Sequence, residues 1–144
     1  MTVARILASK GTREVHTITS AESVGDAAAT LASRRIGALV VSDDGAQVTG
    51  IVSERDVVHW LGREGAACLN RPVADVMTSR VQCCAPEEPV AEIMERMTGG
   101  RFRHMPVVDG GRLAGVISIG DVVKYRMSEL THEAEALSDM IRGF

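Results

Sequence analysis

A serine followed three residues later by an aspartate occurs twice in this sequence, each time behind a glycine and two aliphatic residues. Residues 50–56 read GIVSERD, and residues 115–121 read GVISIGD. Each run predicts a strand that ends at the serine and a helix that begins at the aspartate. The unpaired backbone N–H groups of such a helix start suit a phosphate, and the carboxylate can accept both hydroxyls of a ribose diol. The candidate ligand contacts are Ser53, Asp56, Ser118 and Asp121.

The same spacing also has an ordinary structural explanation. A serine with an acidic residue three positions later forms a capping box, in which each side chain bonds the other residue's backbone N–H. That explanation suits most isolated instances. Here the pattern recurs in register and follows a predicted hairpin both times, which favours a ligand site.

Three basic side chains stand near these motifs. Arg103 and His104 lie at the start of a predicted strand and are candidate phosphate contacts, although one of two neighbours in a strand points outward. Arg55 lies inside the first motif, where an arginine in a first helical turn is more often only exposed. The first copy has Gly37 and Ala38 in place of Arg103 and His104. We therefore expect the cleft of the second motif to hold phosphorylated ligands about tenfold or more tighter.

The motifs belong to a longer internal repeat. The chain matches itself at offsets of 66, 65 and, over a shorter stretch, 70 residues. Similarity at a near-constant period indicates two copies of one structural unit. The matched stretches are residues 15–45 with 81–111, residues 50–58 with 115–123, and residues 3–9 with 73–79.

Each copy is predicted to fold as a βαββα unit. A short strand, at residues 15–18 or 81–84, leads to a helix that follows Ser23 in the first copy and Pro89 in the second. Ser23 can cap its helix, whereas Pro89 fixes φ but offers no side-chain cap. Two strands then form a hairpin around Asp-Gly or Gly-Gly turns. These strands are expected at residues 38–41 and 48–52, and at residues 105–108 and 113–117.

We therefore expect an α/β fold of the α+β kind. A unit of three strands and two helices leaves one sheet face bare, so two units can pack sheet to sheet about a pseudo-twofold axis. Such an interface contains two equivalent clefts, where a ligand would bind. The predicted divisions are residues 1–66 and 67–127 for the two repeats, and residues 128–144 for a C-terminal helical extension.

This arrangement resembles a tandem pair of CBS domains, the family named after cystathionine β-synthase. The resemblance covers nearly all of residues 1–127. Besides the two motifs, it rests on residues 36–41 (IGALVV) and residues 103–109 (RHMPVVD). It implies that the chain binds an adenosine compound such as AMP, ADP, ATP or NAD between the repeats. It also implies that the aspartates hold ribose, the serines reach phosphate, and two chains form a dimer.

The resemblance also suggests which backbone segments surround the ligand. Residues around Thr17–Thr19 and 83–85 would form the wall that accepts adenine. The further ligand contacts implied in this way are Thr17, Ile18, Thr19, Cys84, Ile36, Gly37, Ala38 and Pro106. One departure is Val40, which stands where the second copy has Pro106.

Composition argues against several other functions. The net charge of −3 and an aromatic content of 3% disfavour nucleic-acid binding, and no apolar run approaches the length of a membrane span. Three cysteines without a signal peptide indicate a reducing, cytoplasmic setting. The histidines and cysteines show no metal-ligand spacing, and no catalytic triad order, phosphate loop or dinucleotide fingerprint is present. We expect a protein that is not an enzyme and has no metal and no catalytic cofactor.

The stretch after the second motif predicts one long helix. Its apolar residues fall at spacings of 4, 3, 4, 3 and 4, which is a heptad seam. They are Val123, Met127, Leu130, Ala134, Leu137 and Ile141. We expect this seam to form a homodimer rather than to pack on its own repeat.

The function predicted from these features is an adenine-nucleotide sensor. Because no effector domain is apparent in the sequence, the signal would pass to an unknown effector protein in trans. The alternative is a dimeric interaction scaffold whose clefts are vestigial.

Overall fold

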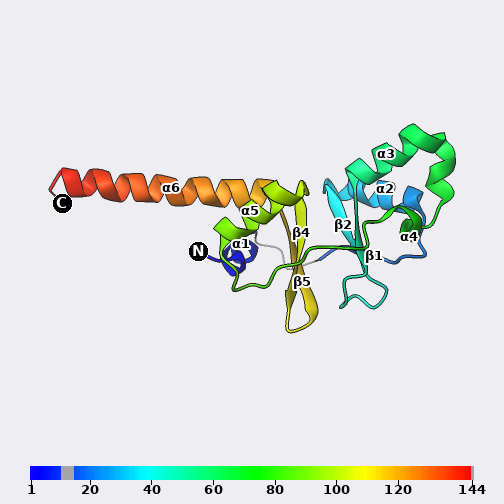
Figure 1. Ribbon diagram of the computed structural model, residues 1–144, viewed down its shortest axis with the longest axis horizontal. Coiled ribbons are helices and arrows are strands. Elements are labelled where there is room, and N and C mark those ends of the chain that lie inside the picture. Colours follow the sequence, from blue (N-terminus) through cyan, green and yellow to red (C-terminus); the bar gives the residue numbers. More distant parts are fainter. Residues whose placement is uncertain (11–14, 144) are drawn as a thin grey trace.

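The computed structural model describes residues 1–10 and 15–143, which form two α+β repeats in tandem and a long C-terminal helix (Figure 1). The first repeat contains β1 (Thr17–Ile18), α2 (Val24–Arg34), β2 (Ala38–Val41), β3 (Gly50–Ser53) and α3 (Glu54–Glu64). The second contains α5 (Val90–Gly100), β4 (His104–Asp109), β5 (Arg112–Ser118) and α6 (Ile119–Ile141). Before them lies α1 (Val3–Ser9), and between them lie the 3₁₀ helix η1 (Gly65–Asn70) and α4 (Val73–Val76).

The two sheets follow the same plan but differ at one strand. In the first repeat β1 pairs in parallel with β2, which pairs in antiparallel with β3. In the second, β4 and β5 are antiparallel, but the strand predicted at residues 81–84 is reduced to a single bridge between Cys84 and Val107. The prediction of a strand there was wrong. Cys84 bonds the carbonyl of Pro106 and the N–H of Val108, but the next bond of the ladder would need an N–H at position 106, which proline lacks.

The helix starts follow from their capping residues. Ser23 caps α2 by accepting a hydrogen bond from the Asp26 N–H (3.0 Å), whereas Pro89 starts α5 without a side-chain cap, as predicted. The motif helices begin earlier than predicted: Ser53 and Ser118 are the N-caps of α3 and α6. Their aspartates therefore sit at the third helical position, since the serine hydroxyl supplies the cap.

The helices α2 and α5 end on arginines with unusual backbone geometry. Arg35 has φ of 53° and Arg101 has φ of 56°, which places both in the left-handed region. A residue with a Cβ atom is strained there by about 1–2 kcal/mol relative to the right-handed form. The strain recurs at equivalent positions of the two repeats, 66 residues apart.

The two hydrophobic cores exchange their short preceding helices. Val3 and Ile6 of α1 pack in the core of the second repeat, with residues such as Met105 and Ile117. Val73 and Val76 of α4 pack instead in the core of the first repeat. Each repeat therefore completes its core with a helix that precedes the other repeat along the chain.

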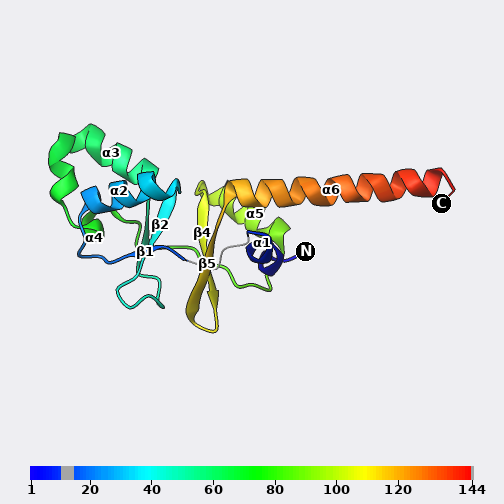
Figure 2. The ribbon, with the colours of Figure 1, turned by 180° about the vertical axis from the view of Figure 1, so that it is seen from behind.

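The strands next to the repeat interface are covered on both faces. Along β2, Leu39 and Val41 belong to the core of the first repeat, while Val40 on the opposite face is also fully buried. Pro106 of β4 is likewise buried between two core residues. The Leu113 N–H donates to the carbonyl of Ala46 (2.7 Å), which ties the two hairpins together. Figure 2 shows β2 and β4 side by side from the opposite direction.

The last helix continues far beyond the second repeat. In Figure 1 only the start of α6 lies against α5, and the rest projects away from both repeats. Its apolar seam is exposed, with 63% of Met127, 50% of Leu130 and 60% of Leu137 accessible to solvent. The seam therefore does not pack on its own repeat.

Candidate ligand-binding site

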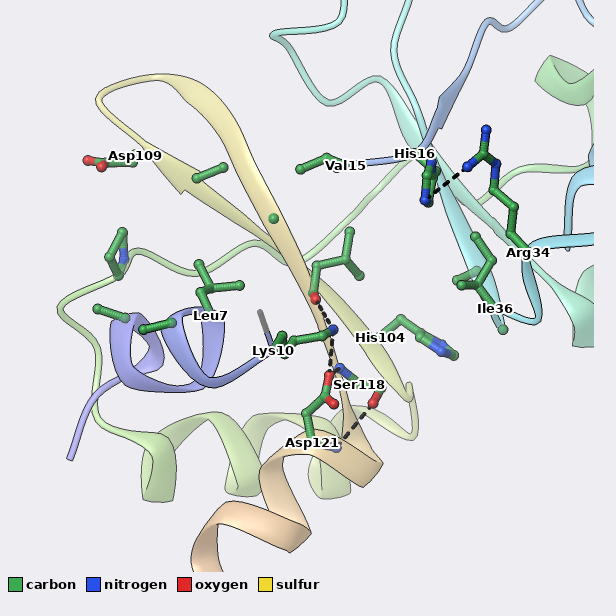
Figure 3. Close-up of a pocket in the computed structure, with 18 of the residues that line it drawn as sticks. Leu7, Lys10, Val15, His16, Arg34, Ile36, His104, Asp109, Ser118 and Asp121 are labelled. Carbon is green, nitrogen blue, oxygen red and sulfur yellow. Dashed lines mark hydrogen bonds and ion pairs between the residues drawn. The ribbon is translucent and has the colours of Figure 1, made fainter. Parts of the chain in front are cut away.

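A cavity of about 1010 Å³ lies between the two repeats (Figure 3). Its volume is at the upper end of the ~300–1,000 Å³ that small-molecule sites occupy. The structure brings six of the predicted site residues to it, which are Ile36, Gly37, Ala38, His104, Ser118 and Asp121. The first repeat supplies three of them and the second repeat the other three, so the site depends on how the repeats pack.

Ser118 and Asp121 are held in place by the start of α6. The Ser118 N–H donates to Asp121 Oδ2 (2.9 Å), and the Asp121 N–H donates to Ser118 Oγ (3.1 Å), which forms a complete capping box. The structural explanation of the motif is therefore correct for this copy. It leaves room for a ligand role, because Asp121 Oδ1 accepts no hydrogen bond from the described residues and Asp121 lines the cavity.

A lysine that the sequence analysis missed also reaches this carboxylate. Lys10 Nζ lies 2.9 Å from Asp121 Oδ2 and donates to the carbonyl of Val116 at 3.0 Å. Burial by itself raises the pKa of Asp121, but hydrogen bonds from the Ser118 N–H and from Lys10 outweigh burial, so that the pKa lies below its ordinary value. The carboxylate is therefore ionised and paired near neutral pH.

His104 faces the first repeat across the cavity. A Cβ atom at position 37 would lie 2.9 Å from His104 Nε2, so Gly37 leaves the space that the imidazole uses. Burial lowers the pKa of His104, and the carboxylates of Glu54 and Asp121 only partly oppose this effect. Near neutral pH His104 is therefore an uncharged hydrogen-bonding group.

Three more basic residues line the cavity from the first repeat: His16, Arg34 and Arg35. Arg34 Nη1 lies 3.4 Å from His16 Nε2 (Figure 3). None of the three was predicted from the sequence as a ligand contact. The one available signal was that Arg35 matches Arg101 in the internal repeat.

The remaining predicted contacts lie outside this cavity. Arg55 and Arg103 are exposed, and neither lines it. Ser53 and Asp56 form the second capping box, with the Ser53 N–H 2.8 Å from Asp56 Oδ2, at the start of α3. Of the others in the first repeat, Thr17 is exposed, Ile18 lies in the hydrophobic core, and the Thr19 N–H donates to the Glu22 carboxylate at 2.8 Å. Cys84 and Pro106 are buried in the second repeat. For these residues a ligand role stays a prediction.

The cysteines and acidic residues do not form a metal centre in the described part of the chain. Across residues 1–10 and 15–143, no group of three or more His, Cys, Asp or Glu side chains is placed to hold a metal ion. Burial raises the pKa of Cys84 to about 12 and also raises that of Cys83. Both thiols are thus protonated and unreactive near neutral pH. None of the described helices is long and apolar enough to cross a membrane.

Comparison with solved structures supports this fold. A CBS-domain containing protein, ATU1752 from Agrobacterium tumefaciens, is 49% identical, and the match covers 88% of this chain and 99% of that one with a TM-score of 0.83. A putative signal-transduction protein with CBS domains from Burkholderia ambifaria is 39% identical, covering 89% and 95% with a TM-score of 0.82. The CBS domain protein PAE2072 from Pyrobaculum aerophilum, solved in complex with AMP, is 26% identical, covering 84% and 89% with a TM-score of 0.73.

Sequence comparison gives the same family. The Arabidopsis thaliana mitochondrial protein CBSX3 is 34% identical over 129 residues, which are 87% of this chain and 63% of CBSX3. The chain thus spans less than two thirds of that relative. The family model of the CBS domain matches residues 5–63 and residues 73–128, which correspond to the two repeats. The chain therefore belongs to the CBS domain family, as a tandem pair of CBS repeats.

Proposed function

We propose that this chain is a regulatory module that binds an adenine nucleotide in the cavity between its repeats. The observation that carries the proposal is the Asp121 carboxylate, which lines the cavity beside Ser118 while Arg34 and Arg35 line the same cavity from the other repeat. A carboxylate can accept a ribose diol, and arginines can pair with phosphate oxygens. The AMP complex of PAE2072 supports the same class of ligand. AMP, ADP, ATP and NAD all carry these groups.

We propose binding rather than catalysis as the role, with α6 as the element that carries the signal. Ser118, at the cavity, is the N-cap of α6, and the helix runs without a break to Ile141. Its 23 residues span about 35 Å at 1.5 Å per residue. A ligand that moves the first turn of α6 would therefore move its exposed seam as well, and an effector protein could detect that motion.

A second copy of this chain is the partner that we propose for the α6 seam. An exposed heptad stripe of this length favours pairing with another helix of the same pattern. Replacing Leu130 by Asp would place a charge in that interface and should convert dimers to monomers in sedimentation velocity. Ala136→Asp, which adds the same charge to an exposed position off the seam, is the control. An unchanged sedimentation coefficient for Leu130→Asp would exclude the seam as the interface.

A ligand panel tests the proposed function. AMP, ADP, ATP, NAD and, for contrast, GMP would be added to the protein in thermal unfolding experiments. A ligand present at 100 times its Kd stabilises by ~2.7 kcal/mol. We expect at least one adenine nucleotide to do so, and Asp121→Ala to weaken its binding about 10- to 100-fold. If no nucleotide stabilises the protein, or if Asp121→Ala binds it equally well, the proposal fails.

The second candidate function is an interaction scaffold with vestigial clefts, which the exposed seam of α6 favours. In that case the panel gives no stabilisation, while Leu130→Asp still changes the assembly state. The two measurements together therefore separate the two functions.

A further inference from the structure

The carboxylate proposed to hold ribose already has a cationic partner from a distant part of the chain. Lys10, just after α1, places Nζ 2.9 Å from Asp121 Oδ2, although 111 residues separate the two in sequence. The same ammonium donates to the carbonyl of Val116 on β5 (3.0 Å). Figure 3 shows the Lys10 side chain extending from the end of α1 to Asp121 inside the cavity.

A ribose diol and Lys10 compete for this carboxylate. Two adjacent hydroxyls donate best when each takes one oxygen of the carboxylate. Asp121 Oδ1 accepts no hydrogen bond from the described residues, but Oδ2 already accepts from the Ser118 N–H and from Lys10. A diol that uses both oxygens must therefore displace the ammonium of Lys10.

The displaced ammonium needs a new anionic partner. Among the described residues, the charged ones that line the cavity, other than the Lys10–Asp121 pair, are Arg34, Arg35 and Asp109. Figure 3 places Asp109 at the far end of the β4–β5 hairpin from Asp121, so it does not replace the lost partner. A ligand phosphate can do so, whereas an unphosphorylated nucleoside brings no negative charge.

We propose that Lys10 makes the cavity selective for phosphorylated nucleosides over uncharged ones. In the ligand-free protein Lys10 neutralises Asp121. A nucleotide binds both side chains at once, with its ribose on the Asp121 carboxylate and its phosphate on the Lys10 ammonium. A nucleoside binds only Asp121 and leaves Lys10 without a counter-charge from the described residues of the cavity. This inference rests on the proposed function, since it concerns the same site.

The test compares AMP with adenosine by titration calorimetry on the full chain. Lys10→Met keeps the length of the side chain but removes its charge. We expect AMP to bind about tenfold or more weakly to this variant, and adenosine to bind more tightly than to the parent protein. The ratio of the two affinities should fall in Lys10→Met and remain in Lys10→Arg, which keeps the cation. Lys124→Met, which removes an exposed lysine from α6, is the matched control.

The outcomes distinguish the role of Lys10 from the proposed nucleotide-binding function. If Lys10→Met weakens AMP and adenosine equally, or leaves their ratio unchanged, the role of Lys10 is wrong while the proposed function stands. If AMP and adenosine both fail to bind the parent protein, the role of Lys10 is wrong, and if ADP, ATP and NAD also fail to stabilise it, the proposed function itself fails. Thermal midpoints of the three variants show whether each is folded.

Discussion

The two Ser-x-x-Asp motifs have nearly the same internal geometry and different surroundings. In both, the serine N–H donates to Oδ2 of the aspartate, at 2.8 Å for Asp56 and 2.9 Å for Asp121. Among the described contacts, only Asp121 also receives a lysine, because Lys10 follows α1. The residue that corresponds to Lys10 in the offset of 70 is Arg80, which is exposed. The repeated motif therefore forms two equivalent helix starts. The residues around each start come from the opposite repeat and from the short helix packed against it, and these differ.

This comparison changes the reason for expecting unequal clefts. From the sequence, Arg103 was expected in the cleft of Asp121, but the wall opposite Asp121 comes from the first repeat, and Arg103 does not line the cavity. By the internal repeat, Arg103 corresponds to Gly37, which lines the cavity of Asp121. Arg103 would thus belong to the cleft of Asp56. The cations that distinguish the Asp121 cavity are Lys10 and Arg34, because Arg35 has an equivalent arginine in Arg101.

The largest expected effect is on the free energy of unfolding, and it tests whether α1 completes the core of the second repeat and α4 that of the first. Ile6→Ala removes a side chain that is 2% exposed in the second core and should cost about 2–5 kcal/mol of unfolding free energy. Hydrogen exchange should then speed up in β4 and β5 rather than in β2 and β3. Val76→Ala in α4 is the matched variant and should show the reverse pattern. Faster exchange of both sheets alike in Ile6→Ala would mean that the cores are not separate units.

The next effect concerns the ligand affinity of the two clefts. Asp121→Ala should weaken AMP binding in the Asp121 cavity, the predicted higher-affinity site, about 10- to 100-fold, because charged hydrogen bonds to the ligand are lost. Asp56→Ala should leave that site intact. Calorimetric titration of each variant would measure this difference. Equal AMP affinities in the two variants would show that the clefts are equivalent.

A smaller effect separates the two strained arginines. Arg35→Gly and Arg101→Gly should each raise stability by up to about 1 kcal/mol, since glycine adopts positive φ without a Cβ clash. Only Arg35 lines the cavity, so only Arg35→Gly should also weaken AMP binding at the Asp121 site. Denaturant unfolding and titration on the same preparations measure both quantities. A loss of stability in both variants would show that the arginines make contacts that outweigh the strain.

The smallest expected effect is the contribution of His104 to the pH dependence of the unfolding free energy. Burial lowers its pKa below the ordinary 6.5, so the unfolded chain takes up a proton before the folded one as pH falls. The stability associated with neutral His104 is complete above pH 6.5 and is lost as pH falls through 6.5 toward the lower folded value. His104→Gln should flatten this part of the curve of unfolding free energy against pH.

Much of the fold followed from the internal repeat. It predicted the two units and their hairpins, while local capping patterns predicted the helix starts at Ser23 and Pro89, and the heptad spacing predicted the long final helix. The repeat did not predict the loss of the strand at residues 81–84, because it aligns Pro106 with Val40 although proline has no N–H for the ladder.

The candidate site was predicted only in part, for a related reason. The motif residues Ser118 and Asp121 could be recognised by local spacing, but an internal repeat shows which residues are equivalent and not which copy faces which. The contributions of His16, Arg34 and Lys10 depend on that packing. Lys10 in particular follows a helix that joins the core of the other repeat.

The exchange of α1 and α4 also has a consequence for the order in which the chain folds. During synthesis α1 leaves the ribosome before both repeats, yet its packing partners in β5 follow more than a hundred residues later. The core of the first repeat can close when α4 has emerged, because all its members precede Met77 or are Met77 itself. The core of the second repeat must instead close a loop around the finished first repeat, and contacts of such long sequence separation form slowly. The ligand cavity, which needs α1, β5 and the start of α6 together, is therefore the last part of the molecule to be assembled.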